Sequence, residues 1–166
     1  MVRRVFYSFH FDADAWRTAQ VRNAGALEGN TPVTDNDWEA IKKGGDAAIK
    51  DWIDKQLVGR SCTVVLIGAG TAGRRWINYE IRESWKANKG LMGIHIHRLL
   101  DQDERPSSKG VNPFSKIRLR SGGSLAKLVP VYDPQASDSR GVYRYITEHL
   151  ASWVEDAIER RERRRK

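Results

Sequence analysis

The run Ser61 to Ile67, SCTVVLI, most restricts what this chain can fold into. It is apolar without alternation and rich in β-branched residues, as is typical of parallel strands that are buried on both faces of a sheet. The glycines of GAGTAG follow it directly, and apolar residues then recur at helical spacing at Ile77, Ile81 and Trp85 until Gly90. This segment therefore predicts a strand, a tight turn and a helix.

Strand and helix patterns alternate along the rest of the chain as well. Further strands are predicted at 3–10, 91–97 and 127–132, helices at 13–24, 36–57 and 138–160, and loops at 25–34 and 97–124. Asn36 followed by Glu39 is a capping signature for the second of these helices, and Gly44-Gly45 predicts a kink within it. The alternation predicts an α/β fold: a flavodoxin-like parallel sheet of about four to five strands with helices on both faces.

Length and charge distribution indicate one domain, at residues 1–160, followed by a basic C-terminal tail at 161–166. Residues 159–166, ERRERRRK, hold six basic and two acidic residues and so carry half of the net charge of +8. We expect this stretch to be a solvated helix end, which makes a nucleic-acid partner a poor explanation of the charge. The single Cys62 is expected to be a buried apolar side chain. Without a signal peptide or membrane-spanning segment, the protein is expected to be cytoplasmic, with no membrane partner.

The glycines Gly68, Gly70 and Gly73 form a G-x-G-x-x-G pattern between a strand and a helix, the context of a dinucleotide-binding oxidoreductase. That fingerprint needs an acidic residue at the end of the following strand to hold the ribose hydroxyls. Here the following strand reads LMGIHIHR, and no acidic residue occurs before Asp101. A tight turn explains the glycines more simply, and the oxidoreductase is kept only as an alternative.

A second pattern, Trp76-x-x-x-Glu80, lies in the helix after these glycines. Residues four apart share one helix face, so the indole lies one turn from the carboxylate. The residues three and four positions away from Glu80 on either side include no base, whereas Glu83 has Lys86 three residues later. An ordinary helical ion pair therefore does not explain Glu80. Ligands of parallel sheets bind beyond the carboxyl ends of the strands. Ser8, Phe9 and His10 end the first predicted strand, so they are expected at the same edge of the sheet as the glycines that precede Trp76 and Glu80.

His95 and His97 point to the same side of a predicted strand, as two metal ligands would. No third cysteine, histidine or acidic residue has a matching spacing. We therefore predict no metal site.

Several segments together resemble the TIR domains and, more closely, the TIR-like proteins of the Thoeris anti-phage defence system, of the ThsB kind. The resemblance covers most of residues 3–114. Its carriers are RVFYSFHFDAD, VRN at 21–23, DNDWEAIKKGGDAAIKDWI, CTVVLIG, RRWINYEI, GIHIH at 93–97 and SKGVNPF at 108–114. The glycine-rich GAGTAG departs from the family, whose members more often carry serines in this loop, and little aligns beyond residue 114.

This resemblance implies a TIR-like fold and cleavage of NAD at its nicotinamide glycosidic bond, followed by hydrolysis or by cyclisation to an ADP-ribose-type signalling nucleotide. Glu80 matches the essential glutamate of the family. Phe9 and Trp76 would enclose the nicotinamide or ribose, and Ser8 and His10 would hold hydroxyls or phosphates; core packing and strand capping are the alternative for these four. Asp46 either lines the pocket or faces solvent.

NAD is expected to be the substrate, with no cofactor. The resemblance further implies a homo-oligomer on activation, a phage-derived trigger, and an effector protein reached through a diffusible nucleotide. The alternative from another class is a non-catalytic TIR-like module for self-association, which has no need of Glu80.

Overall fold

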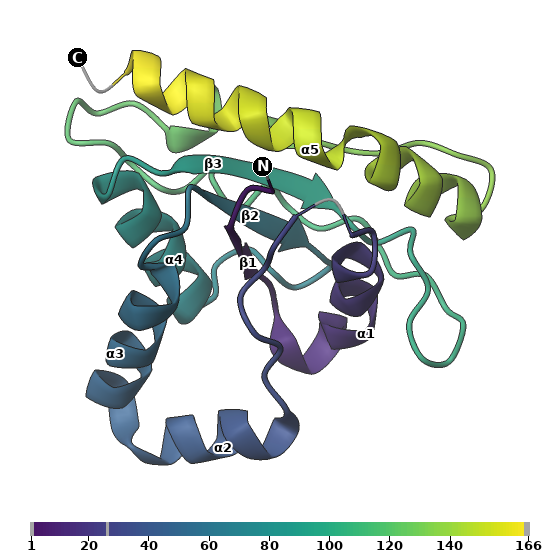
Figure 1. Ribbon diagram of the computed structural model, residues 1–166, viewed down its shortest axis with the longest axis horizontal. Coiled ribbons are helices and arrows are strands. Elements are labelled where there is room, and N and C mark those ends of the chain that lie inside the picture. Colours follow the sequence, from purple (N-terminus) through teal and green to yellow (C-terminus); the bar gives the residue numbers. More distant parts are fainter. Residues whose placement is uncertain (1, 26, 165–166) are drawn as a thin grey trace.

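The computed structural model describes residues 2–25 and 27–164 (Figure 1). In chain order the elements are β1 (Val5–Ser8), α1 (Phe11–Arg22), α2 (Asp35–Lys43), α3 (Gly45–Leu57), β2 (Cys62–Ile67), α4 (Arg75–Lys86), β3 (Gly90–His95), a 3-10 helix at Leu125–Lys127, β4 (Val131–Tyr132) and α5 (Ser139–Arg163). The strands form one parallel sheet in the order β1-β2-β3-β4. The predicted parallel α/β fold is confirmed.

The sheet continues beyond β1 through a single residue, Glu28. The Val5 N–H donates to the Glu28 carbonyl at 2.8 Å, and the Glu28 N–H donates to the Arg3 carbonyl at 2.9 Å. These bonds form an isolated parallel bridge between Arg4 and Glu28. Flavodoxin-like sheets carry their second strand at this outer position. The bridge therefore marks the place of a fifth strand, in agreement with the predicted four to five.

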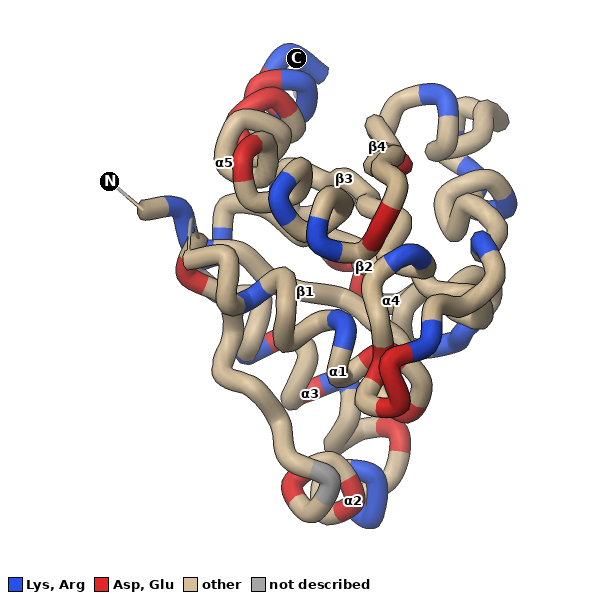
Figure 2. The backbone as a smooth tube through the Cα atoms, turned by 90° about the vertical axis from the view of Figure 1, so that its right-hand side faces the viewer, with Lys and Arg blue, Asp and Glu red and all other residues tan. Residues whose placement is uncertain are grey.

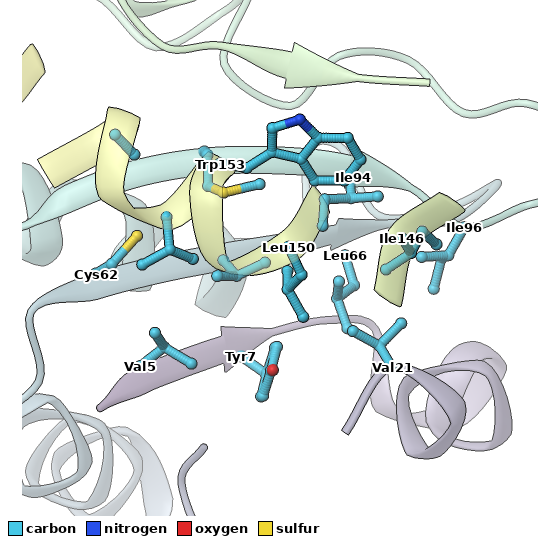
Figure 3. Close-up of a cluster of buried hydrophobic side chains, with 14 of the residues drawn as sticks. Val5, Tyr7, Val21, Cys62, Leu66, Ile94, Ile96, Ile146, Leu150 and Trp153 are labelled. Carbon is cyan, nitrogen blue, oxygen red and sulfur yellow. The ribbon is translucent and has the colours of Figure 1, made fainter. Parts of the chain in front are cut away.

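Helices cover both faces of the sheet. Side chains of β2 alternate between the faces, so Val64 and Leu66 pack beneath α5, whereas Val65 and Ile67 pack against α4. Figure 3 shows the first of these clusters, in which Ile146, Leu150 and Trp153 of α5 lie over Leu66, Ile94 and Ile96 of the strands. Cys62 belongs to the same cluster and is a free, buried thiol, as predicted. Burial on both faces explains the absence of alternation in SCTVVLI.

The helix predicted over 36–57 is broken in two at the glycine pair. Gly45 has a φ of +82°, a left-handed conformation that favours glycine, and α3 leaves this point in a new direction (Figure 1). The predicted cap is wrong by two residues: Thr34 accepts a hydrogen bond from the Asp37 N–H at 3.1 Å, and Asp37 completes the capping box. The strand predicted at 127–132 is also shorter, because residues 125–127 form the 3-10 turn.

The division at residue 160 falls inside α5, which continues to Arg163. Arg161 is buried: its guanidinium carbon lies 3.7 Å from the centre of the Trp85 ring, and Nη2 donates to the Trp85 carbonyl at 2.9 Å. The expected solvated tail is therefore wrong for Arg161, because the aromatic ring and the last turn of α4 compensate its charge. Residues 165–166 lie outside the described part of the chain. None of the helices described is long and apolar enough to cross a membrane.

We expect Arg161→Ala to lower the free energy of unfolding by about 1–2 kcal/mol, because it removes a cation–π contact and a charged hydrogen bond. Arg163→Ala removes an exposed arginine two residues later and should change the free energy of unfolding by less than about 0.5 kcal/mol. Urea unfolding of both variants measures the difference. Equal effects of the two substitutions would show that Arg161 contributes no more than a solvated residue.

Candidate active site

A cavity of about 360 Å³ opens at the carboxyl end of β1 and the beginning of α4. Seven of its lining residues are aromatic: Phe6, Tyr7, Phe9, Phe11, Trp38, Trp52 and Trp76. Four are permanently cationic, namely Arg22, Lys42, Arg74 and Arg75, and the lining carboxyl groups are those of Asp12 and Glu80. An aromatic cavity with a few polar and charged groups suits a flat organic ligand that also carries negative charge.

Glu80 is the buried carboxyl group of this cavity, with 8% of the residue exposed. The Ser8 hydroxyl donates to its Oε1 at 2.6 Å. Among the ion pairs of the described residues none involves Glu80, as its helical neighbours indicated. Burial raises the pKa of Glu80 from 4.5 to about 8, and the hydrogen bond from Ser8 opposes this shift. In the free protein at neutral pH the protonated form of Glu80 is therefore favoured.

Ser8 supports Glu80 and does not line the cavity. It is fully buried on β1, where its side chain faces α4, so the predicted contact of Ser8 with ligand hydroxyls or phosphates is not what the structure shows. Two further hydroxyls fix the same turn of α4 to the sheet. Ser84 donates to the Glu80 carbonyl at 2.7 Å, which leaves Thr63 of β2 as the donor to Ser84 at 2.6 Å. The position of the carboxyl group is thus set from both β1 and β2.

Aromatic side chains extend from Phe9 along one side of the cavity in a row that we call the aromatic row: Phe9, Phe11, Trp38 and Trp52. Neighbouring ring centres lie 6.2, 6.2 and 6.0 Å apart. Phe9 and Trp76 were predicted at the site, and both line the cavity. Phe11, Trp38 and Trp52 were not predicted at the site, because aromatic residues in a helix also suit an ordinary apolar core. The available signals were the capping box that begins α2 and the glycine break after which α3 runs in a different direction (Figure 1).

Cationic groups lie near the beginning of α4. Arg74 donates to the Gly70 carbonyl at 2.7 Å, and the Arg75 guanidinium lies 4.5 Å from the centre of the Trp76 ring. His10 is among the residues that line the cavity. Burial, together with the Arg74 guanidinium, lowers the pKa of His10, so its neutral form is favoured at pH 7. Arg74 and Arg75 were not predicted at the site.

Asp46 is exposed and is not among the residues that line the cavity. It forms an ion pair with Arg75 at 2.6 Å. Of the two alternatives for Asp46, the structure therefore shows exposure to solvent, and Asp46 reaches the cavity only through Arg75. Because both partners are largely exposed, this pair adds little to stability, and its effect is on where the guanidinium lies.

The first glycine of the loop, Gly68, is closely packed by other parts of the protein. The Gly68 N–H donates to Thr71 Oγ1 at 2.8 Å, and a Cβ at Gly68 would lie 2.0 Å from an oxygen of the buried Asp14. Gly110 also packs against this residue: a Cβ added at Gly110 would lie 2.0 Å from the Gly68 carbonyl oxygen. Gly68 is therefore required for close packing, and its backbone is not open to a pyrophosphate. This geometry gives the oxidoreductase alternative no support.

His95 and His97 pack edge to face with ring centres 5.8 Å apart and do not line the cavity. Burial lowers the pKa of both histidines, and the nearby Asp133 carboxylate opposes this shift. Asp133 forms an ion pair with Lys109 at 2.9 Å. Within residues 2–25 and 27–164, no group of three or more side chains has the arrangement of a metal site.

The match to a protein-family model decides the family. The model described as Thoeris protein ThsB, TIR-like domain, matches residues 6–101, more than half of the chain. The chain belongs to this TIR-like family. The matched part of the TIR-like domain contains β1 to β3, α4 and Glu80.

A curated protein of Bacillus cereus (strain MSX-D12), named "Putative cyclic ADP-D-ribose synthase ThsB1", is 40% identical over 122 residues. The alignment covers 70% of this chain and 64% of that protein, so it spans less than two thirds of the relative.

The raised pKa of Glu80 makes stability depend on pH. Because the unfolded chain loses this proton near pH 4.5 and the folded protein only near pH 8, the folded state loses stability through this group as the pH rises between the two values. Glu80→Gln removes the loss. We expect the variant to exceed the wild type by at least about 1 kcal/mol at pH 8.5, since one pKa unit corresponds to about 1.4 kcal/mol, and to lose this advantage below about pH 5.

Urea unfolding across this pH range measures the effect. Glu83→Gln, on the same helix, is the matched control and should show no such rise, because Glu83 pairs with Lys86 at the surface. A difference between wild type and Glu80→Gln that is constant with pH would contradict the burial of an ionisable group at this position.

Proposed function

We propose that this protein cleaves the bond between nicotinamide and ribose in NAD and forms a cyclic ADP-ribose-type signalling nucleotide. The observation that carries the proposal is the buried Glu80 carboxyl group, held by Ser8 inside an aromatic cavity. The name of the Bacillus cereus relative supports the same class of product. NAD is the substrate in this proposal, and no further cofactor is required.

The reaction needs charge stabilisation more than proton transfer. When the bond between the ribose C1′ and the ring nitrogen breaks, the nitrogen keeps the electron pair, and nicotinamide leaves as a neutral molecule without a general acid. Positive charge then develops on the ribose, as in other glycoside cleavages, and a nearby carboxylate stabilises it. A nucleophilic atom of the same ADP-ribose unit closes the ring, or water attacks and gives ADP-ribose.

The charge of Glu80 would respond to the substrate. Burial favours the protonated carboxyl group in the free protein. The cationic nicotinamide ring would favour the carboxylate, to which the Ser8 hydroxyl donates a hydrogen bond. NAD binding would thus release a proton from Glu80 and place its negative charge where the ribose cation forms. This coupling gives Ser8 a positioning function.

The remaining lining residues fit the other parts of NAD. Phe9 and Trp76 offer ring faces for the nicotinamide, and the aromatic row continues from Phe9. Arg74 and Arg75 would bind the pyrophosphate, since guanidinium groups pair with phosphate oxygens in a bidentate manner. Neutral His10 would bind a hydroxyl or phosphate oxygen.

Membership of the Thoeris family supports a role for this chemistry in anti-phage defence. In this setting the nucleotide would diffuse to an effector protein, and the chain would form a homo-oligomer when a phage-derived trigger activates it. A non-catalytic module for self-association is the alternative from another class. Self-association does not explain why a carboxyl group is buried where ionisation is costly. The burial of Glu80 therefore favours the enzyme over the adaptor.

We expect Glu80→Gln to lower the rate of nicotinamide release from NAD by at least about a hundredfold, because it removes the charge that stabilises the ribose cation. Glu83→Gln, three residues away on the outer side of α4, should keep nearly full activity. Nicotinamide release is measured by chromatography, on protein purified from cells exposed to phage if the unstimulated protein is silent.

Absorbance of the reduced cofactor is recorded on the same samples. Nicotinamide release without reduced cofactor fits the proposal, whereas stable reduced cofactor would support the oxidoreductase. Unchanged nicotinamide release by folded Glu80→Gln would overturn the assignment of Glu80. Phage protection that survives Glu80→Gln but requires self-association would favour the adaptor.

A further inference from the structure

A second hollow, which we call the basic groove, lies between the C-terminal ends of α4 and α5 and the segment 117–128. Its volume is about 480 Å³. No residue lines both the basic groove and the cavity of Glu80. The groove is therefore a separate site that the proposed NAD chemistry does not use.

The charge of the basic groove is entirely positive. Its ionisable lining residues are five arginines and one lysine: Arg82, Lys86, Arg118, Arg120, Arg161 and Arg164. Within the part of the chain that the structure describes, Lys86 has an ion pair, 3.7 Å from Glu83, whereas Arg82, Arg118, Arg120 and Arg164 have none. Figure 2 shows the basic segments on the loops beside β4 and at the end of α5. This concentration of guanidinium groups favours an anionic ligand.

The floor of the basic groove is apolar. Leu119 and Leu128 are half-buried residues that line the groove, and Ile117 and Leu125 of the core cluster under α4 lie buried beside them. A ligand that fills the groove must therefore combine negative charges at the rim with apolar groups at the floor.

We propose that the basic groove binds an acidic and apolar segment of a partner protein. Carboxylates of the segment would pair with Arg82, Arg118 and Arg120 at the rim, as arginine clusters do in the recognition of acidic motifs. Its apolar side chains would cover the leucines and isoleucine of the floor.

A nucleic acid fits the same observations less well. Proteins that bind single strands offer free aromatic faces to the bases. Trp85, the aromatic residue among those that line the groove, has a face occupied by the Arg161 guanidinium at 3.7 Å. Four aliphatic side chains in the floor suit leucine or phenylalanine better than a phosphate backbone.

The test uses the full chain and a fluorescein-labelled peptide that repeats Glu-Glu-Phe, with binding measured by fluorescence anisotropy at about 150 mM salt, where weak surface attraction is screened. We expect the double variant Arg118→Glu, Arg120→Glu to bind the peptide at least about tenfold more weakly than the wild type. Both side chains are exposed, so the fold should persist, and thermal unfolding confirms this. A peptide of glutamates alone should also bind more weakly, because it leaves the floor uncovered.

The matched control is Arg140→Glu, Arg144→Glu, which makes the same change in charge on exposed residues in the first two turns of α5, at the end opposite the groove. This control should keep the wild-type affinity within about threefold. An equal loss of peptide affinity in both double variants would overturn the proposal, because the attraction of the peptide would then depend on the net charge of the protein and not on the groove. Tighter binding of a labelled oligothymidine, lost in the groove variant alone, would overturn it in favour of a nucleic acid.

Discussion

The burial of β2 and β3 on both faces determines where polar chemistry can occur in this molecule. With α1 and α5 on one side and α3 and α4 on the other, a polar side chain in the sheet has no access to water except at the strand ends. Ser8 ends β1 and reaches Glu80 across the face that α4 covers. The hydrogen bond between them couples the first strand to the helix that carries the cavity's buried carboxyl group. Because burial makes that carboxyl group costly to ionise in the free protein, a cationic ligand would favour its ionised form.

A buried ion pair next to the site fixes the glycine loop against the rest of the sheet edge. Both residues lie on α1, where Arg17 Nη1 is 3.0 Å from Asp14 Oδ1. The Arg17 guanidinium also donates to the carbonyls of Leu99 and Arg105 at 2.8 and 2.9 Å. The Asp14 carboxyl group packs directly on Gly68. One pair of charges therefore joins α1, the loop after β2 and the loop after β3. Removing one partner would leave a buried charge, which is the costly way to break such a pair.

The sequence predicts the parts of this structure that depend on local pattern. An unbroken apolar run is sufficient to place β2, and the position of Glu80 without a helical base is sufficient to single it out. The orientation of Ser8 could not be derived in the same way. Side chains of a strand alternate between the two faces of the sheet, so a shift of this four-residue strand by one residue would turn Ser8 to the other face. Trp38 and Trp52 lie within the helix predicted at 36–57, but the break at the left-handed Gly45 separates α2 from α3, and the two rings then lie 6.0 Å apart at the cavity. Arg161 was expected in solvent, because a run of arginines alone does not indicate that one of them packs on the Trp85 indole of α4, 76 residues earlier in the chain.

The central claim is that the charge of Glu80 responds to a cation in the cavity. A carbon-13 NMR titration of the Glu80 carboxyl group, assigned with Glu80→Gln, tests this claim directly in the free protein and with a non-cleavable, cationic analogue of NAD. We expect a midpoint near pH 8 in the free protein, which falls by at least about one unit when the analogue binds. A midpoint near 4.5 in the free protein, or one that does not move with the bound cation, would contradict the account.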